Sequence, residues 1–158
     1  MLFRSPAPFV SEATVTGAAP DADPVRQVLA DEATRGTPGP VVIRSHDLGR
    51  IAAGPVELIV RDAAPGTVID IAAAEHLDGA GSLATLGQHA GLRYVCAGGP
   101  EERFASLEAI GTRHLHLSVR TPDGAAAPDI DVAVRDRHRP RPAGADFACS
   151  DQIGRAHV

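Results

Sequence analysis

The chain has 158 residues, which is enough for one domain with a hydrophobic core. Hydrophobic residues make up 44% of the chain, which is typical of a globular protein. Aromatic residues make up only 3%, so the core must be built from Val, Ile, Leu and Ala. A net charge of −5 argues against nucleic acid or an anionic membrane as the main partner. No apolar run approaches the ~20 residues of a membrane span, and two cysteines make no disulfide framework.

The two ends of the chain resemble a nucleotide adapter rather than protein sequence. With a GTG start, MLFRS back-translates to GTGCTCTTCCGATCT, and IGRAHV back-translates to ATCGGAAGAGCACACGTC. The two strings are reverse complements over most of their length. We therefore expect residues 1–5 and 153–158 to derive from a sequencing-library adapter, and we exclude them from the fold prediction. The same adapter accounts for Gln152.

Residues 6–40 are rich in Ala, Pro, Gly and Asp. We interpret this region as the tail of an upstream domain and a linker, with one short helical turn expected at 23–30. It is predicted to be poorly structured.

Strand and turn signals then recur at short, regular spacing. In chain order they are the apolar run 41–43, the alternating segment 56–61, the turn 65–66, the strand 67–71, the Gly-rich loop 78–91, three short strands within 91–120, the turn 122–124 and the alternating strand 130–135. About seven strands in ~100 residues, with no long helix, are typical of an antiparallel β-sandwich. The predicted fold class is therefore all-β, with the sandwich at 41–142.

The segment Gly91–Arg120 illustrates the alternation on which this prediction depends. Leu115, Leu117 and Val119 fall on one face of a strand, whereas His114, His116, Ser118 and Arg120 fall on the other. We expect the first face to be buried and the second to be wet.

Two patterns suggest ligand sites only weakly. The glycines of Asp78-Gly79-Ala80-Gly81 do not match the spacing of a phosphate-binding loop, and the chain contains no Lys, so we predict a hairpin loop. His114 and His116 have the spacing of a zinc-binding pair, but no third ligand is evident and two solvated imidazoles are expected. No metal and no cofactor are predicted.

No nucleophile or acid–base pair is supported either. Cys96 and Cys149 lie in no redox motif, and Ser150 lacks the flanking glycines of a nucleophile elbow. Glu101 and Glu102 are adjacent and should point to opposite faces of a strand. Asp129 and Asp131 share a face, but it is the one opposite the apolar side chains. We predict no catalytic residue in this chain.

Several motifs in order resemble the concanavalin-like β-sandwich of bacterial α-L-rhamnosidases. The resembling segments are HDLGRIAAGPVEL (46–58), PGTVID (65–70) with EHLD (75–78), RYVC (93–96), ERF (102–104), IGTRHL (110–115), VRDRH (134–138) and ADFACSD (145–151). Leu48 and His114 replace the family's usual Phe and Tyr. The resemblance covers roughly Val41–Asp151.

This resemblance implies an inverting glycosidase that releases terminal α-L-rhamnose with one carboxylic acid and one carboxylate. In the family both groups lie in an (α/α)6 barrel after the sandwich, so residues 143–152 are expected to begin the linker into that barrel. The expected partners are therefore rhamnose-containing glycosides, bound through the barrel, and the barrel itself. We expect the chain as given to lack hydrolase activity and to aggregate through the apolar face that the barrel would cover.

Two alternatives remain open from the sequence. The chain is consistent with a free-standing carbohydrate-binding sandwich or with a structural β-domain. A sugar-binding module commonly offers an aromatic platform, and one Tyr and four Phe provide little for it. This composition favours a scaffold over a lectin.

Overall fold

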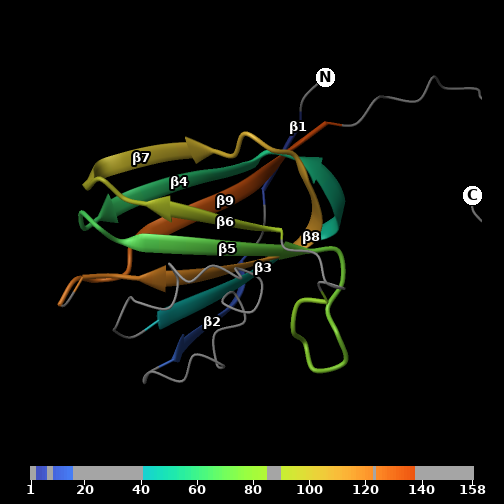
Figure 1. The fold of residues 1–158 in the computed structure, drawn as a ribbon, viewed down its shortest axis with the longest axis horizontal. Coiled ribbons are helices and arrows are strands. Elements are labelled where there is room, and N and C mark those ends of the chain that lie inside the picture. The colour runs from blue at the N-terminus through green and yellow to red at the C-terminus, as the bar shows by residue number, and fades with distance from the viewer. Residues whose placement is uncertain (1–2, 7–8, 16–40, 85–89, 123, 138–158) are drawn as a thin grey trace, which may run out of the picture.

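A computed structural model describes residues 3–6, 9–15, 41–84, 90–122 and 124–137 of the chain. These residues form two antiparallel β-sheets that lie face to face (Figure 1). The described part contains no α-helix, and therefore none long and apolar enough to cross a membrane. The prediction of an all-β, antiparallel sandwich is confirmed.

The two sheets have four and five strands. Sheet A has the order β1 (Phe3–Pro6), β9 (Asp129–Asp136), β4 (Val56–Ala63) and β7 (Gly99–Ala105). Sheet B has the order β2 (Phe9–Val15), β3 (Val41–Gly54), β8 (Ile110–Arg120), β5 (Val68–Ala74) and β6 (Gly91–Val95).

Strands β3 to β9 correspond to the seven predicted strands, whereas β1 and β2 were not predicted. β1 pairs with β9 and β2 pairs with β3, so each lies at the edge of its sheet. An open sheet edge presents unpaired N–H and C=O groups, and a passing segment satisfies them whatever its composition. The predicted helical turn at 23–30 and the segments 143–152 and 153–158 lie outside the described residues.

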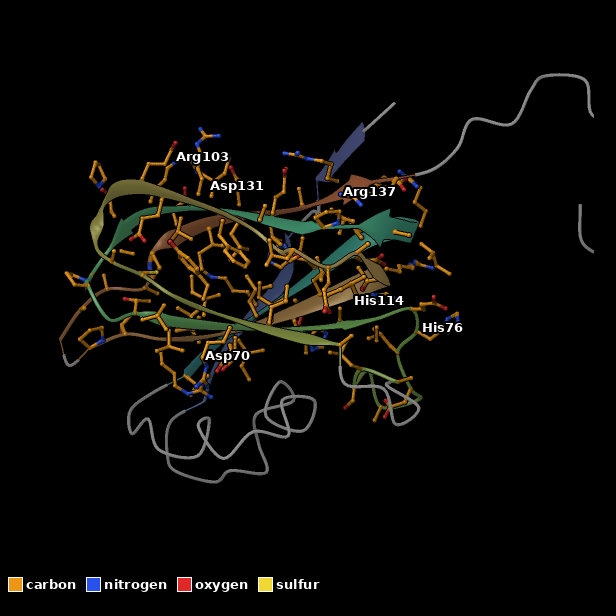
Figure 2. All side chains as sticks on the ribbon, turned by 45° about the horizontal axis from the view of Figure 1, so that its top comes forward. Asp70, His76, Arg103, His114, Asp131 and Arg137 are labelled. Carbon is orange, nitrogen blue, oxygen red and sulfur yellow. The ribbon has the colours of Figure 1, made fainter. Side chains whose placement is uncertain are left out.

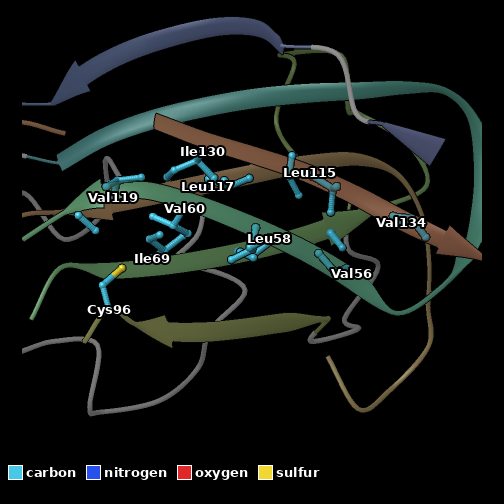
Figure 3. Packing of buried hydrophobic residues seen from close by; sticks show 14 of the residues in the cluster. Val56, Leu58, Val60, Ile69, Cys96, Leu115, Leu117, Val119, Ile130 and Val134 are labelled. Atoms are coloured by element: carbon cyan, nitrogen blue, oxygen red, sulfur yellow. The ribbon is translucent and has the colours of Figure 1, made fainter. Parts of the chain in front are cut away.

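The core lies between the two sheets and is almost entirely aliphatic (Figure 3). Alternate residues of β4 and β9 point toward sheet B, and alternate residues of β8 and β5 point toward sheet A. The fully buried members include Val56, Leu58, Val60, Ile69, Ile71, Leu115, Leu117, Val119 and Val134. Alternation with a period of two thus placed the core correctly on each strand.

The expectation of a wet second face on β8 is wrong. His116, Ser118 and Arg120 are exposed to only 7%, 0% and 1%. β8 is the central strand of sheet B, paired with β3 on one side and β5 on the other. On this face Arg120 donates to Asp70 of β5 at 2.7 Å, and the polar residues are buried as well.

Two turns have the chemistry that the sequence indicated. At Pro65-Gly66 the Thr67 N–H donates to the Ala64 carbonyl at 3.1 Å, and Gly66 has φ of 83°. Pro in the second position and Gly with positive φ in the third define a type II turn. The turn after Pro122 closes through a bond of 3.0 Å from the Ala125 N–H to the Pro122 carbonyl.

Sheets A and B meet at the end of β3. The Arg135 N–H donates to the Pro55 carbonyl at 2.9 Å, and the Arg137 N–H donates to the Ala53 carbonyl at 2.8 Å. A Cβ atom on Gly54 would lie 1.9 Å from the Arg135 carbonyl oxygen, so only glycine allows this approach. The chain passes from sheet B into sheet A through this contact.

We predict that Gly54→Ala destabilises the fold by at least ~2–3 kcal/mol, because backbone atoms rather than a flexible side chain must move. Urea unfolding followed by circular dichroism would measure this. Gly49→Ala is the comparison variant, since its Cβ would meet no atom within 4 Å and its cost comes only from a φ of 73°. A smaller loss for Gly54→Ala than for Gly49→Ala would contradict the account.

Candidate functional site

Asp47 organises a wide bulge in β3. Between the pairs Asp47–His114 and Ala52–Thr112, four residues of β3 lie opposite one residue of β8. The Asp47 carboxylate accepts two bonds from Arg113, at 2.9 and 3.0 Å, and Oδ1 accepts the Gly49 N–H at 2.7 Å. The bulge is therefore fixed by a bidentate ion pair and a local turn.

These contacts hold Asp47 in its charged form. The hydrogen bond from Arg113, followed by that from the Gly49 N–H, lowers the pKa of Asp47 to about 2. A general acid needs the opposite displacement, because it must hold its proton near neutral pH. The pKa of Asp47 is thus displaced away from the direction that a general acid requires.

His114 and His116 share the outer face of β8, as predicted, but they are not solvated. His114 Nδ1 lies 3.9 Å from Asp47 Oδ2, and its side chain is 12% exposed. Burial lowers the pKa of both imidazoles, and for His116 the nearby His114 and His46 lower it further. No group of three His, Cys, Asp or Glu side chains positioned for a metal occurs within the described residues.

The most deeply buried charges belong to Asp70 and Arg120, each 1% exposed at its side chain. Arg120 Nη1 donates to Asp70 Oδ2 at 2.7 Å, and Arg93 adds bonds of 2.6 and 2.8 Å to the two oxygens. Figure 2 shows Asp70 on sheet B, away from the core. The sequence interpretation missed this cluster, although an Asp in an otherwise apolar strand already indicates a buried counter-ion.

Glu101 and Glu102 point to opposite faces of β7, as the strand geometry required. Glu101 faces outward and contacts Arg61 at 3.4 Å and Arg103 at 2.8 Å. Glu102 accepts instead from the Tyr94 hydroxyl at 2.7 Å and from two backbone N–H groups, those of Ala97 and Gly98, at 2.9 Å each. The Tyr94 bond is the main cause of the lowered pKa of Glu102.

Asp129 and Asp131 do share the exposed face of β9. Arg61 bridges them, with nitrogen–oxygen distances of 3.0 and 3.2 Å. Figure 2 places Asp131 near Arg103 on the outer side of sheet A. Neither carboxylate lies in an enclosed site that could desolvate a substrate.

The remaining candidates have structural explanations. Cys96 is a free, buried thiol, and burial raises its pKa to about 11. In the loop after β5, Asp78 Oδ1 accepts the N–H groups of Ala80 and Ser82, and Leu77 pairs with Leu83. This is the predicted hairpin loop, with those N–H groups bound to Asp78. Cys149 and Ser150 lie outside the described residues.

The polar groups of the sandwich thus form ion pairs that hold strands together. Among the described residues, the two carboxyl groups with displaced pKa values, Asp47 and Glu102, are both displaced downward. A family model described as the bacterial alpha-L-rhamnosidase concanavalin-like domain matches residues 37–134. The chain belongs to this family. The family resemblance found in the sequence motifs is therefore confirmed.

Solved rhamnosidases contain the same sandwich. A GH78 family rhamnosidase of Bacillus sp. GL1 matches with a TM-score of 0.57 and 26% identity, over 74% of this chain and 12% of that chain. The alpha-L-rhamnosidase from Dictyoglumus thermophilum matches with a TM-score of 0.51 and 20% identity, over 72% and 13%. The chain therefore spans about an eighth of these enzymes. No curated protein matches it.

We predict that the rhamnosidase sandwich loses stability as the pH falls below ~6.5, the model-peptide value for histidine. His114 and His116 have lowered pKa values in the fold, so the unfolded chain binds more protons in this range. Each adds a slope of at most ~1.4 kcal/mol per pH unit. The contribution of Asp47 to stability is lost in a separate pH range, as the pH falls from about 4 to its folded pKa of about 2.

Urea midpoints between pH 5 and 8 would test this, with His116→Gln expected to flatten the slope. His76→Gln is the matched control, because the His76 side chain is exposed. Stability that does not change between pH 7.5 and 5.5 would contradict the prediction.

We also predict that Asp70→Asn costs ~3–5 kcal/mol, because it removes a buried charge that two arginines contact. Asp129→Asn is the comparison variant. Its side chain is 72% exposed, and exposed pairs contribute at most ~1 kcal/mol. Urea unfolding at pH 7.5 distinguishes them, and equal losses would contradict a structural role for Asp70.

Proposed function

We propose that this chain is a non-catalytic, ancillary sandwich of an inverting glycoside hydrolase that releases terminal α-L-rhamnose. On this proposal the acid and the base lie in a following (α/α)6 domain, and the 158 residues have no hydrolase activity themselves. The observation that carries the proposal is the family match over residues 37–134, in a chain that spans only about an eighth of the solved rhamnosidases it matches.

The chemistry of the carboxylates supports a non-catalytic role. An inverting glycosidase needs two carboxyl groups ~6.5–9.5 Å apart, one of them with a raised pKa. Asp47 and Glu102 accept bonds from a cation or from backbone N–H groups, which stabilise the charged form, and Asp70 is ion-paired with Arg93 and Arg120. Asp129 and Asp131 point to solvent and are bridged by one arginine.

The aromatic residues do not favour the alternative of a carbohydrate-binding module. The rings of Tyr94 and Phe104 pack against each other, with centroids 5.1 Å apart and planes tilted by 35°. The Tyr94 hydroxyl is bonded to Glu102, and both rings are half-buried. A flat, exposed ring on which a sugar could stack is therefore not offered by this pair.

The purified chain should release no p-nitrophenol from p-nitrophenyl α-L-rhamnoside above a heat-treated control, and rhamnose should produce no heat of binding at millimolar concentration. Hydrolysis above the control would refute the non-catalytic assignment. Saturable rhamnose binding without hydrolysis would instead favour the carbohydrate-binding alternative.

The parent gene offers an independent test. A longer coding sequence that contains residues 41–151 should continue into repeated helical hairpins, and its product should hydrolyse the same glycoside. A native stop codon directly after Asp151 would contradict the proposal.

A further inference from the structure

Apolar side chains gather at one end of the sandwich. Of the described residues, the large hydrophobic ones that are exposed are Ile51, Leu77, Val95 and Leu107, at 49%, 39%, 55% and 100%. All except Val95 lie at the end where β3, β5, β7 and β9 finish and β8 begins (Figure 1). We call Ile51, Leu77 and Leu107 the apolar end.

Strand register places the three residues at this same end. Ile51 precedes Ala52, which pairs with Thr112 near the start of β8. Leu77 follows Ala74, which pairs with His114 on the same strand. Leu107 lies between β7 and Ile110, the residue that pairs with Gly54. The first residues of β8 are therefore adjacent to all three segments.

Each of these side chains belongs to a segment whose backbone is fixed by hydrogen bonds. The Ser106 N–H donates to the Val56 carbonyl at 2.9 Å, and the Ser106 hydroxyl donates to the Glu108 carbonyl at 2.7 Å, which fixes the backbone on both sides of Leu107. Asp47 fixes the bulge that carries Ile51. The bridge from Leu77 to Leu83 fixes the third segment.

Charged groups surround the apolar end. Arg50, Glu75, Glu108 and Arg137 are exposed, and Arg50 is bonded to Asp136 at 2.6 Å. An apolar centre with a polar rim is the usual composition of an interface between protein domains. A scattered exposed Leu is ordinary, but here three exposed apolar side chains lie on fixed segments at the same end of the sandwich.

The chain itself indicates what covers the apolar end. The bond from the Arg137 N–H to the Ala53 carbonyl holds the last described residue at the apolar end. Figure 2 shows Arg137 on the same side of the molecule as His114 and His76. Whatever follows Arg137 in the polypeptide therefore starts beside Ile51, and the match to this chain covers only 12% and 13% of the two solved rhamnosidases.

We propose that the apolar end, Ile51, Leu77 and Leu107, is the docking surface for the domain that follows Arg137 in the parent polypeptide. This inference rests on the proposed function, because it requires a following domain. It assigns the contact to the end of the sandwich rather than to the outer face of either sheet.

Hydrogen exchange measured by mass spectrometry on the 158-residue chain and on the parent protein tests the proposal. Peptides that cover 48–53 and 104–110 should exchange at least tenfold more slowly in the parent. A peptide that covers 92–97, at the opposite end and containing the exposed Val95, is the internal control and should exchange equally in both proteins.

Variants give a second measurement. Leu107→Asp should leave the urea midpoint of the 158-residue chain unchanged, since its side chain is already fully exposed. In the parent it should lower the melting temperature or separate one transition into two. Val95→Asp is the matched control and should leave the melting profile of the parent in one transition.

The outcomes separate the two proposals. A parent that hydrolyses rhamnosides while 48–53 and 104–110 exchange as fast as in the short chain overturns the docking surface alone. A gene that ends after Asp151 overturns both. A third outcome is that these peptides become more protected in the short chain as its concentration rises, with dimers in sedimentation. That result assigns the surface to a second copy of the chain and also overturns the proposal.

Discussion

The fold depends on packing two sheets against each other almost entirely with aliphatic side chains. A sheet buries a face only if another layer covers it, and here each sheet covers the other. Because the chain has no Trp and few other aromatic residues, no single large side chain fills the space. Close packing must come from many Val, Ile and Leu residues that alternate along β4, β5, β8 and β9. The contact at Gly54, where β3 crosses into sheet A, keeps the two layers in position.

The buried polar residues support this packing by joining neighbouring strands. Asp70 joins β5, β6 and β8 through Arg93 and Arg120, and Asp47 joins β3 to β8 through Arg113. In both cases one carboxylate connects neighbouring strands of sheet B. Such groups resemble candidate catalytic residues in sequence, because catalytic and structural carboxylates are both surrounded by cations. Burial, partners and the direction of the pKa displacement distinguish them.

Strand periodicity predicted the core well because burial between two layers affects every second residue. The same periodicity failed on the outer face of β8, where it predicted solvent at His116 and Arg120. Period two states that the two faces differ, but it does not show whether the second face is covered. β1 and β2 were missed because residues 1–5 were excluded from the fold prediction and residues 6–40 were interpreted as a linker. The family motifs identified the sandwich, whereas the apolar end required coordinates, since Ile51, Leu77 and Leu107 are separated in sequence.

The bond between Tyr94 and Glu102 has a consequence for the solubility of the chain. β6 and β7 are edge strands of different sheets, and an uncovered edge can add a strand from another molecule and begin aggregation. Glu102 connects the two edges by accepting the Tyr94 hydroxyl together with the N–H groups of Ala97 and Gly98. Those N–H groups follow β6 directly, where an incoming strand would seek donors. The Glu102 carboxylate thus links the edge strands of the two sheets and places a negative charge where a strand from another molecule could pair.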